Sequence, residues 1–157
     1  MPRDIGIQEL SALNDCYARC IDEDQLEAWP ELFTEHCIYK VTTADNYARG
    51  YQAGLIYADT RAMLKDRVNS LRKANVYEQH RYRHVIGAPA VMAQNGDTVS
   101  AESAFLIVRI MRDGTLSLFA TGKYVDTLVG DAAALKFSQR IVVCDGGNVD
   151  ALLAIPL

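Results

Sequence analysis

The stretch from Asn95 to Asp145 decides the fold, and it reads NGDTVSAESAFLIVRIMRDGTLSLFATGKYVDTLVGDAAALKFSQRIVVCD. Segments rich in β-branched and aromatic residues predict three long strands, over Val99–Met111, Thr115–Leu128 and Leu135–Asp145. Glycine-containing pairs predict the tight turns beside them, at Asn95-Gly96, Asp113-Gly114 and Gly130-Asp131. Three strands joined in this way form an antiparallel meander. Strands of about ten residues or more also require a strongly twisted, curled sheet.

The N-terminal half is expected to supply helices. Apolar residues three and four positions apart form one stripe from Ile7 to about Ile21, which indicates an amphipathic helix. A second helix is expected from about Thr60 to Ala74, with Asp59 as its cap. Its predicted apolar face comprises Met63, Leu64, Val68 and Leu71. Helices followed by hairpin-linked strands indicate an α+β fold, and helices laid in the concave side of a curled sheet form a cone.

Shorter elements connect these segments. A turn is expected at Trp29-Pro30, a strand over Cys37–Thr42 and a loop from Asp45 to Gly54. Another strand is expected over Tyr82–Ala93, with a bulge or bend at Gly87-Ala88-Pro89 because proline lacks an N–H for the ladder. The periodicity predicts a core that contains Trp29, Phe33, Tyr39, Leu64, Phe105 and Phe119.

Composition narrows the class of function. The 157 residues fit one domain, taken as residues 1–157. A net charge of −4 and a pI near 5.3 argue against a nucleic-acid binder, which favours a basic surface. Neither a long apolar run nor a signal peptide is evident, so we expect a cytoplasmic protein with no membrane association. In that compartment the four cysteines are expected to be free, buried thiols: Cys16, Cys20, Cys37 and Cys144.

The sequence lacks the motifs of metal and catalytic sites. Rieske clusters take two cysteines and two histidines, and non-haem iron takes two histidines and a carboxylate, but no such set occurs at a suitable spacing. His80 and His84 would lie about 13 Å apart on a strand, too far to share one metal. A pocket for proton transfer could be assembled from Tyr39, His84 and Asp126, with Tyr124 beside them. The alternative is that these tyrosines are core residues with hydrogen-bonded hydroxyls.

The densest unusual stretch runs from Tyr77 to His84 and combines cationic with aromatic residues. Alternation along a strand places Arg81, Arg83 and Val85 on one face, and Tyr82, His84 and Ile86 on the other. Tyrosine and arginine are enriched at protein interfaces, so Tyr77, Arg81 and Arg83 are candidate partner-interface residues. The alternative is a solvated face with local salt bridges.

Several short motifs, in order along nearly the whole chain, are similar to those of one known family. They are Trp29-Pro30-Glu31-Leu32-Phe33 with Cys37-Ile38-Tyr39; Met63-Leu64 with Arg67; Ala74-Asn75-Val76-Tyr77-Glu78; Arg81-Tyr82-Arg83-His84; Phe119 to Asp126; and Arg140 to Asp145. On these residues the chain resembles the small (β) subunits of aromatic-ring-hydroxylating dioxygenases, which have the cone-shaped fold of the nuclear-transport-factor-2-like (NTF2-like, cystatin-like) superfamily. One departure is Gly87-Ala88, where many members carry an asparagine.

The resemblance implies a non-catalytic structural subunit that supports assembly of the catalytic large subunits. Within the family it is most similar to small subunits of oxygenases for aromatic carboxylates, such as terephthalate dioxygenase and salicylate 5-hydroxylase. It implies a hexamer of three large and three small subunits. The large subunit is expected to hold the Rieske 2Fe–2S cluster and mononuclear Fe(II), and a reductase, with or without a ferredoxin, to deliver electrons from NADH. This chain would carry no cofactor, no metal and no catalytic residue.

A second hypothesis remains open on the residues alone. The same fold could enclose a polar pocket, and the chain would then be a free-standing dehydratase or isomerase that uses Tyr39, His84 and Asp126. The two hypotheses differ in where unsatisfied groups should lie. A subunit should expose apolar and arginine-bearing surface, whereas a pocket enzyme should hold free polar groups inside.

Overall fold

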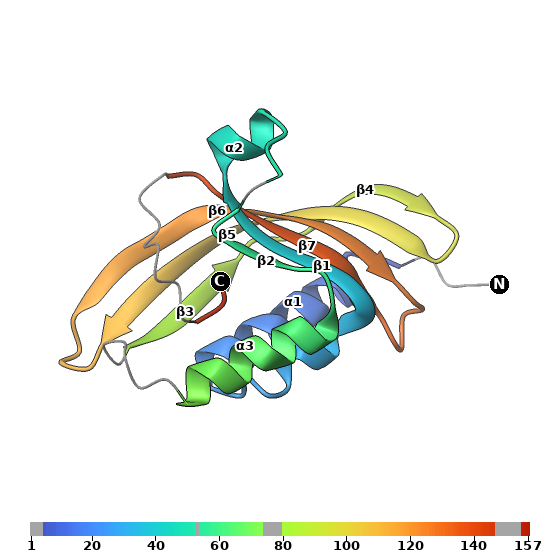
Figure 1. Cartoon of the computed structure of the whole chain (residues 1–157). Coiled ribbons are helices and arrows are strands. Elements are labelled where there is room, and N and C mark those ends of the chain that lie inside the picture. The colour runs from blue at the N-terminus through green and yellow to red at the C-terminus, as the bar shows by residue number, and fades with distance from the viewer. Residues whose placement is uncertain (1–4, 53, 74–79, 147–154) are drawn as a thin grey trace.

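A computed structural model describes residues 5–52, 54–73, 80–146 and 155–157, and it has an α+β architecture as predicted. A curved sheet covers the two longer helices on its concave side (Figure 1). The helical elements are α1 (Ile7–Asp22), the 3-10 turn η1 (Trp29–Leu32), α2 (Ala44–Ala48) and α3 (Arg61–Lys73). The strands are β1 (Phe33–Thr43), β2 (Ile56–Ala58), β3 (His80–Ile86), β4 (Ala90–Asn95), β5 (Thr98–Met111), β6 (Leu116–Val129) and β7 (Lys136–Cys144).

The sheet has the strand order β2-β1-β7-β6-β5-β3, and β4 also pairs with β5. The predicted meander is confirmed, since β5, β6 and β7 pair antiparallel in sequence. The sheet as a whole is mixed, because β1 pairs parallel with β7. The expectation of a purely antiparallel sheet was therefore wrong at this one pair. β1 comes from the far end of the chain, so no tight turn dictates its direction.

The two long helices follow their apolar stripes. Leu10, Tyr17 and Ile21 of α1 are buried as the spacing predicts, but Ile7, the first residue of the predicted stripe, is exposed. The apolar face of α3 is narrower than expected, since Leu64 and Val68 are buried but Met63 is exposed. Its cap is also different: the hydroxyl of Thr60, and not Asp59, accepts a hydrogen bond from the N–H of Met63 at 3.2 Å.

The connection between β1 and α3 contains more structure than predicted. The segment from Asp45 to Gly54, expected as a loop, begins within the short helix α2, where the Thr43 hydroxyl accepts from the N–H of Asn46 at 3.2 Å. Strand β2 was not predicted at all, since its three residues are too short for a visible alternation. β1 begins at Phe33, four residues before the predicted strand.

The core forms between the concave face of the sheet and helices α1 and α3. Five of the six predicted core residues are fully buried: Trp29, Phe33, Tyr39, Leu64 and Phe105. Phe119 is half-buried because it lies at a register shift between β5 and β6, where it stacks on Tyr82. β6 and β7 approach closely at Gly122, where a Cβ atom would lie 1.9 Å from the carbonyl oxygen of Val143. That contact accounts for the glycine in the middle of a long strand.

Candidate functional site

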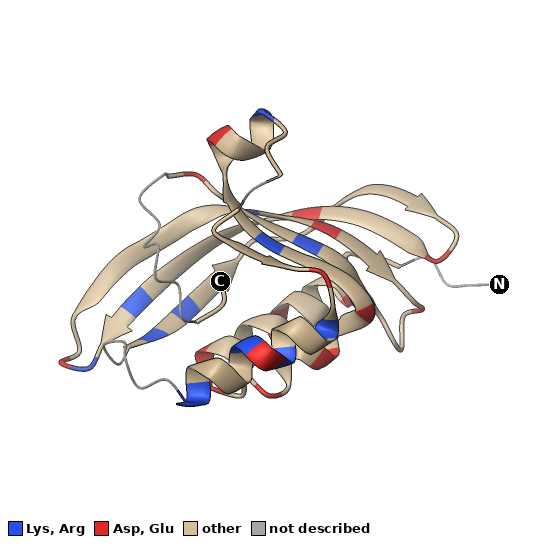
Figure 2. Ribbon diagram, viewed as in Figure 1, with Lys and Arg blue, Asp and Glu red and all other residues tan. Residues whose placement is uncertain are grey.

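Strand β3 presents its two arginines to the outside, as predicted. Arg81, Arg83 and Val85 are exposed on its outer face, whereas Tyr82 and His84 are buried on its inner face. Figure 2 shows the basic residues of β3 along the strand at the side of the sheet. In the described part of the chain, no ion pair involves Arg81 or Arg83. The third predicted interface residue, Tyr77, lies outside the described residues.

The neighbours of these arginines on the outer face are apolar. Register pairs Arg81 with Ile110, Arg83 with Val108 and Val85 with Leu106. On β6 the next residues across are Leu116 and Leu118, which are 66% and 65% exposed. We call this set the arginine face: Arg81, Arg83, Val85, Leu106, Val108, Ile110, Leu116 and Leu118. Exposed leucines beside arginines are the composition of a protein-binding surface more than of a solvated sheet face.

The interior is built around a different arginine. Arg140 of β7 is fully buried and makes two hydrogen bonds to the carboxylate of Asp126, each at 2.8 Å. Its Nη2 also donates to Oδ1 of Asn14 at 2.5 Å. The guanidinium carbon lies 4.3 Å, 3.9 Å and 4.1 Å from the ring centroids of Tyr17, Tyr124 and Phe137, respectively. Arg140 therefore ties helix α1 to strands β6 and β7.

Asp126, a candidate of the pocket hypothesis, is committed to this ion pair. Burial raises the pKa of the Asp126 carboxyl, and the neighbouring Arg140 opposes the rise. The hydroxyl of Tyr124 has no hydrogen-bond partner among the described residues, and burial raises its pKa well above the usual value. Neither group is placed to exchange a proton with a molecule from solvent, since both side chains are buried in the core.

His84 is engaged with the end of helix α1. Its Nδ1 lies 2.6 Å from Oδ1 of Asp22, and its backbone N–H donates to Oδ2 of the same carboxylate at 2.8 Å. Both side chains are nearly inaccessible to solvent. One carboxylate thus holds both the ring and the main chain of His84, which fixes β3 against α1.

Tyr39, the third candidate, contacts the last residue of the sequence. Its hydroxyl is 3.2 Å from both the N–H and the carbonyl oxygen of Leu157, and Tyr17 also donates to that oxygen. Burial raises the pKa of Tyr39 well above its usual value. Tyr39, His84 and Asp126 are therefore each hydrogen-bonded to a different group. All three lie around Tyr17, which shares the Leu157 oxygen with Tyr39, is in edge contact with His84 and lies under Arg140, the partner of Asp126. Each of the three candidates is buried and bound within the fold.

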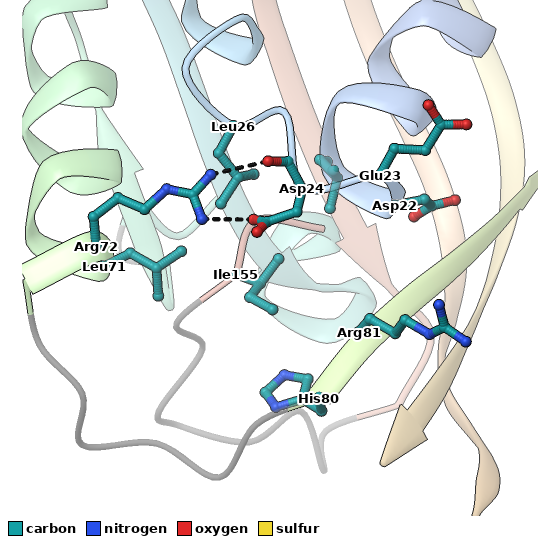
Figure 3. A pocket seen from close by; sticks show the side chains of 10 residues that line it. Asp22, Glu23, Asp24, Leu26, Leu71, Arg72, His80, Arg81 and Ile155 are labelled. Carbon is teal, nitrogen blue, oxygen red and sulfur yellow. Dashed lines mark hydrogen bonds and ion pairs between the residues drawn. The ribbon is translucent and has the colours of Figure 1, made fainter. Parts of the chain in front are cut away.

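An open pocket of about 480 Å³ lies at the end of the cone, outside this core. Figure 3 shows Asp24 paired with Arg72 on one wall, and Ile155 beneath them. His80 and Arg81 stand on the β3 side, with Arg81 directed away from Ile155. Both polar and apolar side chains line this pocket, and among its described lining residues no nucleophile stands next to a general base.

The other predicted sites can be placed as well. In the described ranges, no group of three or more histidine, cysteine or acidic residues could hold a metal ion, and no helix is long and apolar enough to span a membrane. All four cysteines are free. Cys20, Cys37 and Cys144 are buried as expected, but Cys16 is exposed, because it lies on the outer side of α1 away from the apolar stripe.

The sequence reasoning missed the partners of the buried polar residues. Asp22, Asn14 and Leu157 were not assigned a role, although each binds a residue that the motifs contain. Asp22 follows the last apolar residue of a helical stripe and therefore resembles any solvated helix end. The one available signal was Arg140, an arginine followed by Ile141, Val142 and Val143 on a predicted strand, where a charge on the buried face requires a partner.

Comparison with known proteins gives consistent results. Residues 17–150 match the family model described as "Ring hydroxylating beta subunit". The chain is 42% identical over 149 residues to the terephthalate 1,2-dioxygenase terminal oxygenase subunit beta 1 of a Comamonas species, covering 95% of this chain and 97% of the relative. It is 37% identical to the anthranilate 1,2-dioxygenase small subunit of Burkholderia cepacia, covering 95% and 92%. A crystal structure assigned as the beta subunit of an aromatic-ring-hydroxylating dioxygenase of Novosphingobium aromaticivorans superposes with a TM-score of 0.88 at 35% identity, covering 96% of this chain and 95% of the other.

Proposed function

Because the chain belongs to the family of ring-hydroxylating beta subunits, we propose that it is the non-catalytic small subunit of an oxygenase for an aromatic carboxylate. Support for the substrate class comes from the relatives: those named for terephthalate and anthranilate, both aromatic carboxylates, are 42% and 37% identical to this chain. Support for the non-catalytic role comes from the interior, where the three candidate catalytic residues have separate partners within the fold.

The proposal assigns the redox chemistry to other chains. The large subunit would hold the Rieske 2Fe–2S cluster and the mononuclear Fe(II), and a reductase, with or without a ferredoxin, would supply electrons from NADH. Three large and three small subunits would form the hexamer in the cytoplasm. The terminal oxygenase relatives are named as beta subunits, which supports a larger partner. This chain would contribute a single rigid domain to that assembly.

The arginine face is the surface that we assign to the large subunit. The observation that carries this assignment is the pair Arg81 and Arg83, which are exposed and form no ion pairs among the described residues. Half-buried Ile110 and Val108 of β5 lie next to them, and the exposed Leu116 and Leu118 of β6 lie one strand further across. On the same outer side of the sheet, Lys123 is paired with Glu102 at 2.7 Å, whereas neither arginine has such a partner among the described residues. Carboxylates on the large subunit would form ion pairs with Arg81 and Arg83, since guanidinium groups bind carboxylates in a bidentate geometry.

Co-purification with the large subunit tests the proposed function. A tag on this chain should retain the co-expressed large subunit, and the complex should contain iron and show visible Rieske absorption. The small chain purified alone should contain no iron. Stoichiometric iron in the isolated small chain, or failure to retain any Rieske-type large subunit encoded in the same genome, would contradict the proposal.

A further inference from the structure

The last three residues of the sequence are built into the interior. Leu157 is fully buried, and its N–H and carbonyl oxygen both lie 3.2 Å from the hydroxyl of Tyr39. Tyr17, from helix α1, donates to the same carbonyl oxygen. In Figure 1 this segment, red and marked C, lies on the side of the sheet that faces the helices. Its main chain is thus held by two side chains from distant parts of the sequence, as a bound peptide would be.

The groups around the Leu157 carbonyl oxygen are hydrogen-bond donors. These are the hydroxyls of Tyr17 and Tyr39, and the Tyr39 hydroxyl also accepts from the Leu157 N–H. Next to Tyr39 lies the fully buried Trp29, whose indole N–H has no hydrogen-bond partner among the described residues. Arg140 adds positive charge on the face of the Tyr17 ring, 4.3 Å from its centroid. Such surroundings favour an oxygen acceptor and disfavour a cation.

Aromatic rings surround this donor set. Trp29 and Tyr39 are in edge contact with ring centroids 5.1 Å apart, and Phe33 lies 5.6 Å from Trp29. Phe137 joins Phe33 to Tyr17, at 5.4 Å and 5.9 Å. We call these five residues the aromatic cluster: Tyr17, Trp29, Phe33, Tyr39 and Phe137. A group of donors within an apolar lining is the composition of a small-molecule site.

The tail also separates this cluster from the open pocket of about 480 Å³. Ile155 lines the pocket together with Leu26 and Leu71 (Figure 3). Leu157, two residues further on, contacts the tyrosines of the cluster. Removal of Ile155, Pro156 and Leu157 would therefore leave a continuous path from the pocket to the donors.

We propose that the aromatic cluster is a binding site for a small apolar molecule with a carbonyl or carboxylate head, and that residues 155–157 occupy it as an intramolecular ligand. The two tyrosine hydroxyls bind the oxygen of the head, and the rings contact its apolar body. The site is distinct from the arginine face and does not depend on the proposed role in assembly. Leucine itself defines the probe: 4-methylpentanoate keeps its side chain and its carboxyl carbon.

The test compares the full chain with a variant that lacks residues 155–157. Trp29 is the one tryptophan of the sequence and belongs to the cluster, so its fluorescence reports on occupancy. The tail-less variant should bind 4-methylpentanoate at least tenfold more tightly than the full chain does. The matched amine, 4-methylpentylamine, should not compete, because its ammonium group would be buried without a counter-charge beside the guanidinium of Arg140. Adding Tyr17→Phe and Tyr39→Phe to the tail-less variant should weaken carboxylate binding by tenfold or more.

If the variant that lacks residues 155–157 does not fold alone, a second measurement tests the proposal. The peptide acetyl-Ile-Pro-Leu, added during refolding, should restore the circular dichroism of the full chain saturably, and a scrambled peptide, acetyl-Leu-Ile-Pro, should do so at least tenfold less well. Equal binding of the acid and the amine, binding unaffected by loss of both hydroxyls, or a folded tail-less variant that binds neither probe nor peptide would overturn the proposal. So would a variant that neither folds alone nor refolds with the peptide.

Discussion

Arg140 and the pair Arg81 and Arg83 carry the same guanidinium group into opposite surroundings. Arg140 is fully buried, and Asp126, Asn14 and three aromatic rings surround it. The two arginines of β3 are exposed on the outer face and form no ion pair within the described residues. Arg140 thus has its hydrogen-bond and ion-pair partners within the chain, whereas Arg81 and Arg83 have no ion-pair partner among the described residues.

This difference separates what holds the fold from what is available to a partner. A buried charge is tolerated only when its counter-charge and hydrogen bonds come with it, so Arg140 is structural. An exposed arginine beside leucines makes little contribution to the fold, and its surroundings suit contact with another protein. Substitutions in the two regions should accordingly change different quantities, folding in the first case and association in the second.

The largest effect on folding is expected from Arg140→Ala. The substitution leaves the carboxylate of Asp126 buried without its counter-charge, which typically costs about 3–5 kcal/mol in the free energy of unfolding. Urea denaturation followed by circular dichroism measures it. Lys123→Ala is the matched control, since it breaks the exposed pair with Glu102 and should cost less than about 1 kcal/mol. Equal losses for the two variants would remove the distinction between interior and surface.

A smaller loss is expected from Asp22→Ala. It leaves the ring and the backbone N–H of His84 without their acceptor, and an unsatisfied buried group typically costs about 1–3 kcal/mol. Asp22→Asn keeps one acceptor oxygen and should be less destabilising. The free energy of unfolding is again the quantity measured. A chain as stable with alanine as with aspartate would show that α1 and β3 are held by apolar packing alone.

Leu118→Ser should leave folding almost unchanged. Leu118 is 65% exposed, and substitutions at such positions usually alter the free energy of unfolding by less than about 0.5 kcal/mol. The same variant should bind the large subunit more weakly, as measured by analytical ultracentrifugation. A folding loss comparable to that of Asp22→Ala would mean that the arginine face belongs to the core.

The smallest effect concerns Arg72, an exposed arginine whose partners are within the chain. Its hydrogen bonds to Glu27 lower the pKa of that carboxyl from 4.5 to about 2. Because the folded pKa is the lower one, the stabilisation is present above about pH 4.5 and is lost as the pH falls through about 2. Carbon NMR of the Glu27 carboxyl should find it ionised at about pH 4, and Arg72→Ala should return its midpoint toward 4.5. An unchanged midpoint in the variant would refute the pairing.

The helices and strands that could be predicted from the sequence are those in which apolar residues recur at a regular spacing. Alternation placed Arg81 and Arg83 outside and Tyr82 and His84 inside, and both assignments are confirmed. The parallel pairing of β1 with β7 could not be predicted, because it joins segments about a hundred residues apart with no turn between them. The prediction that Met63 lies on the buried face of α3 was wrong, because the spacing of apolar residues does not show whether a residue at the edge of a stripe is buried.

The buried polar contacts were the least predictable part of the site. Asp22 reaches His84 across 62 residues, and Asn14 reaches Arg140 across 126. No local pattern encodes such distances, whereas the apolar residues that follow Arg140 on its predicted strand indicate that its charge needs a buried partner. Sequence could therefore indicate that a partner exists but could not identify it.

The most direct test of the account is the affinity of the large subunit for a small subunit that carries both Arg81→Ala and Arg83→Ala. The account predicts a loss of about 2–5 kcal/mol in association, measured by analytical ultracentrifugation, while the circular dichroism and unfolding midpoint of the variant remain those of the unmodified chain. Full affinity for the large subunit would contradict it, because the two arginines would then be a solvated face. An unfolded variant would contradict it too, since the arginines would then hold the fold.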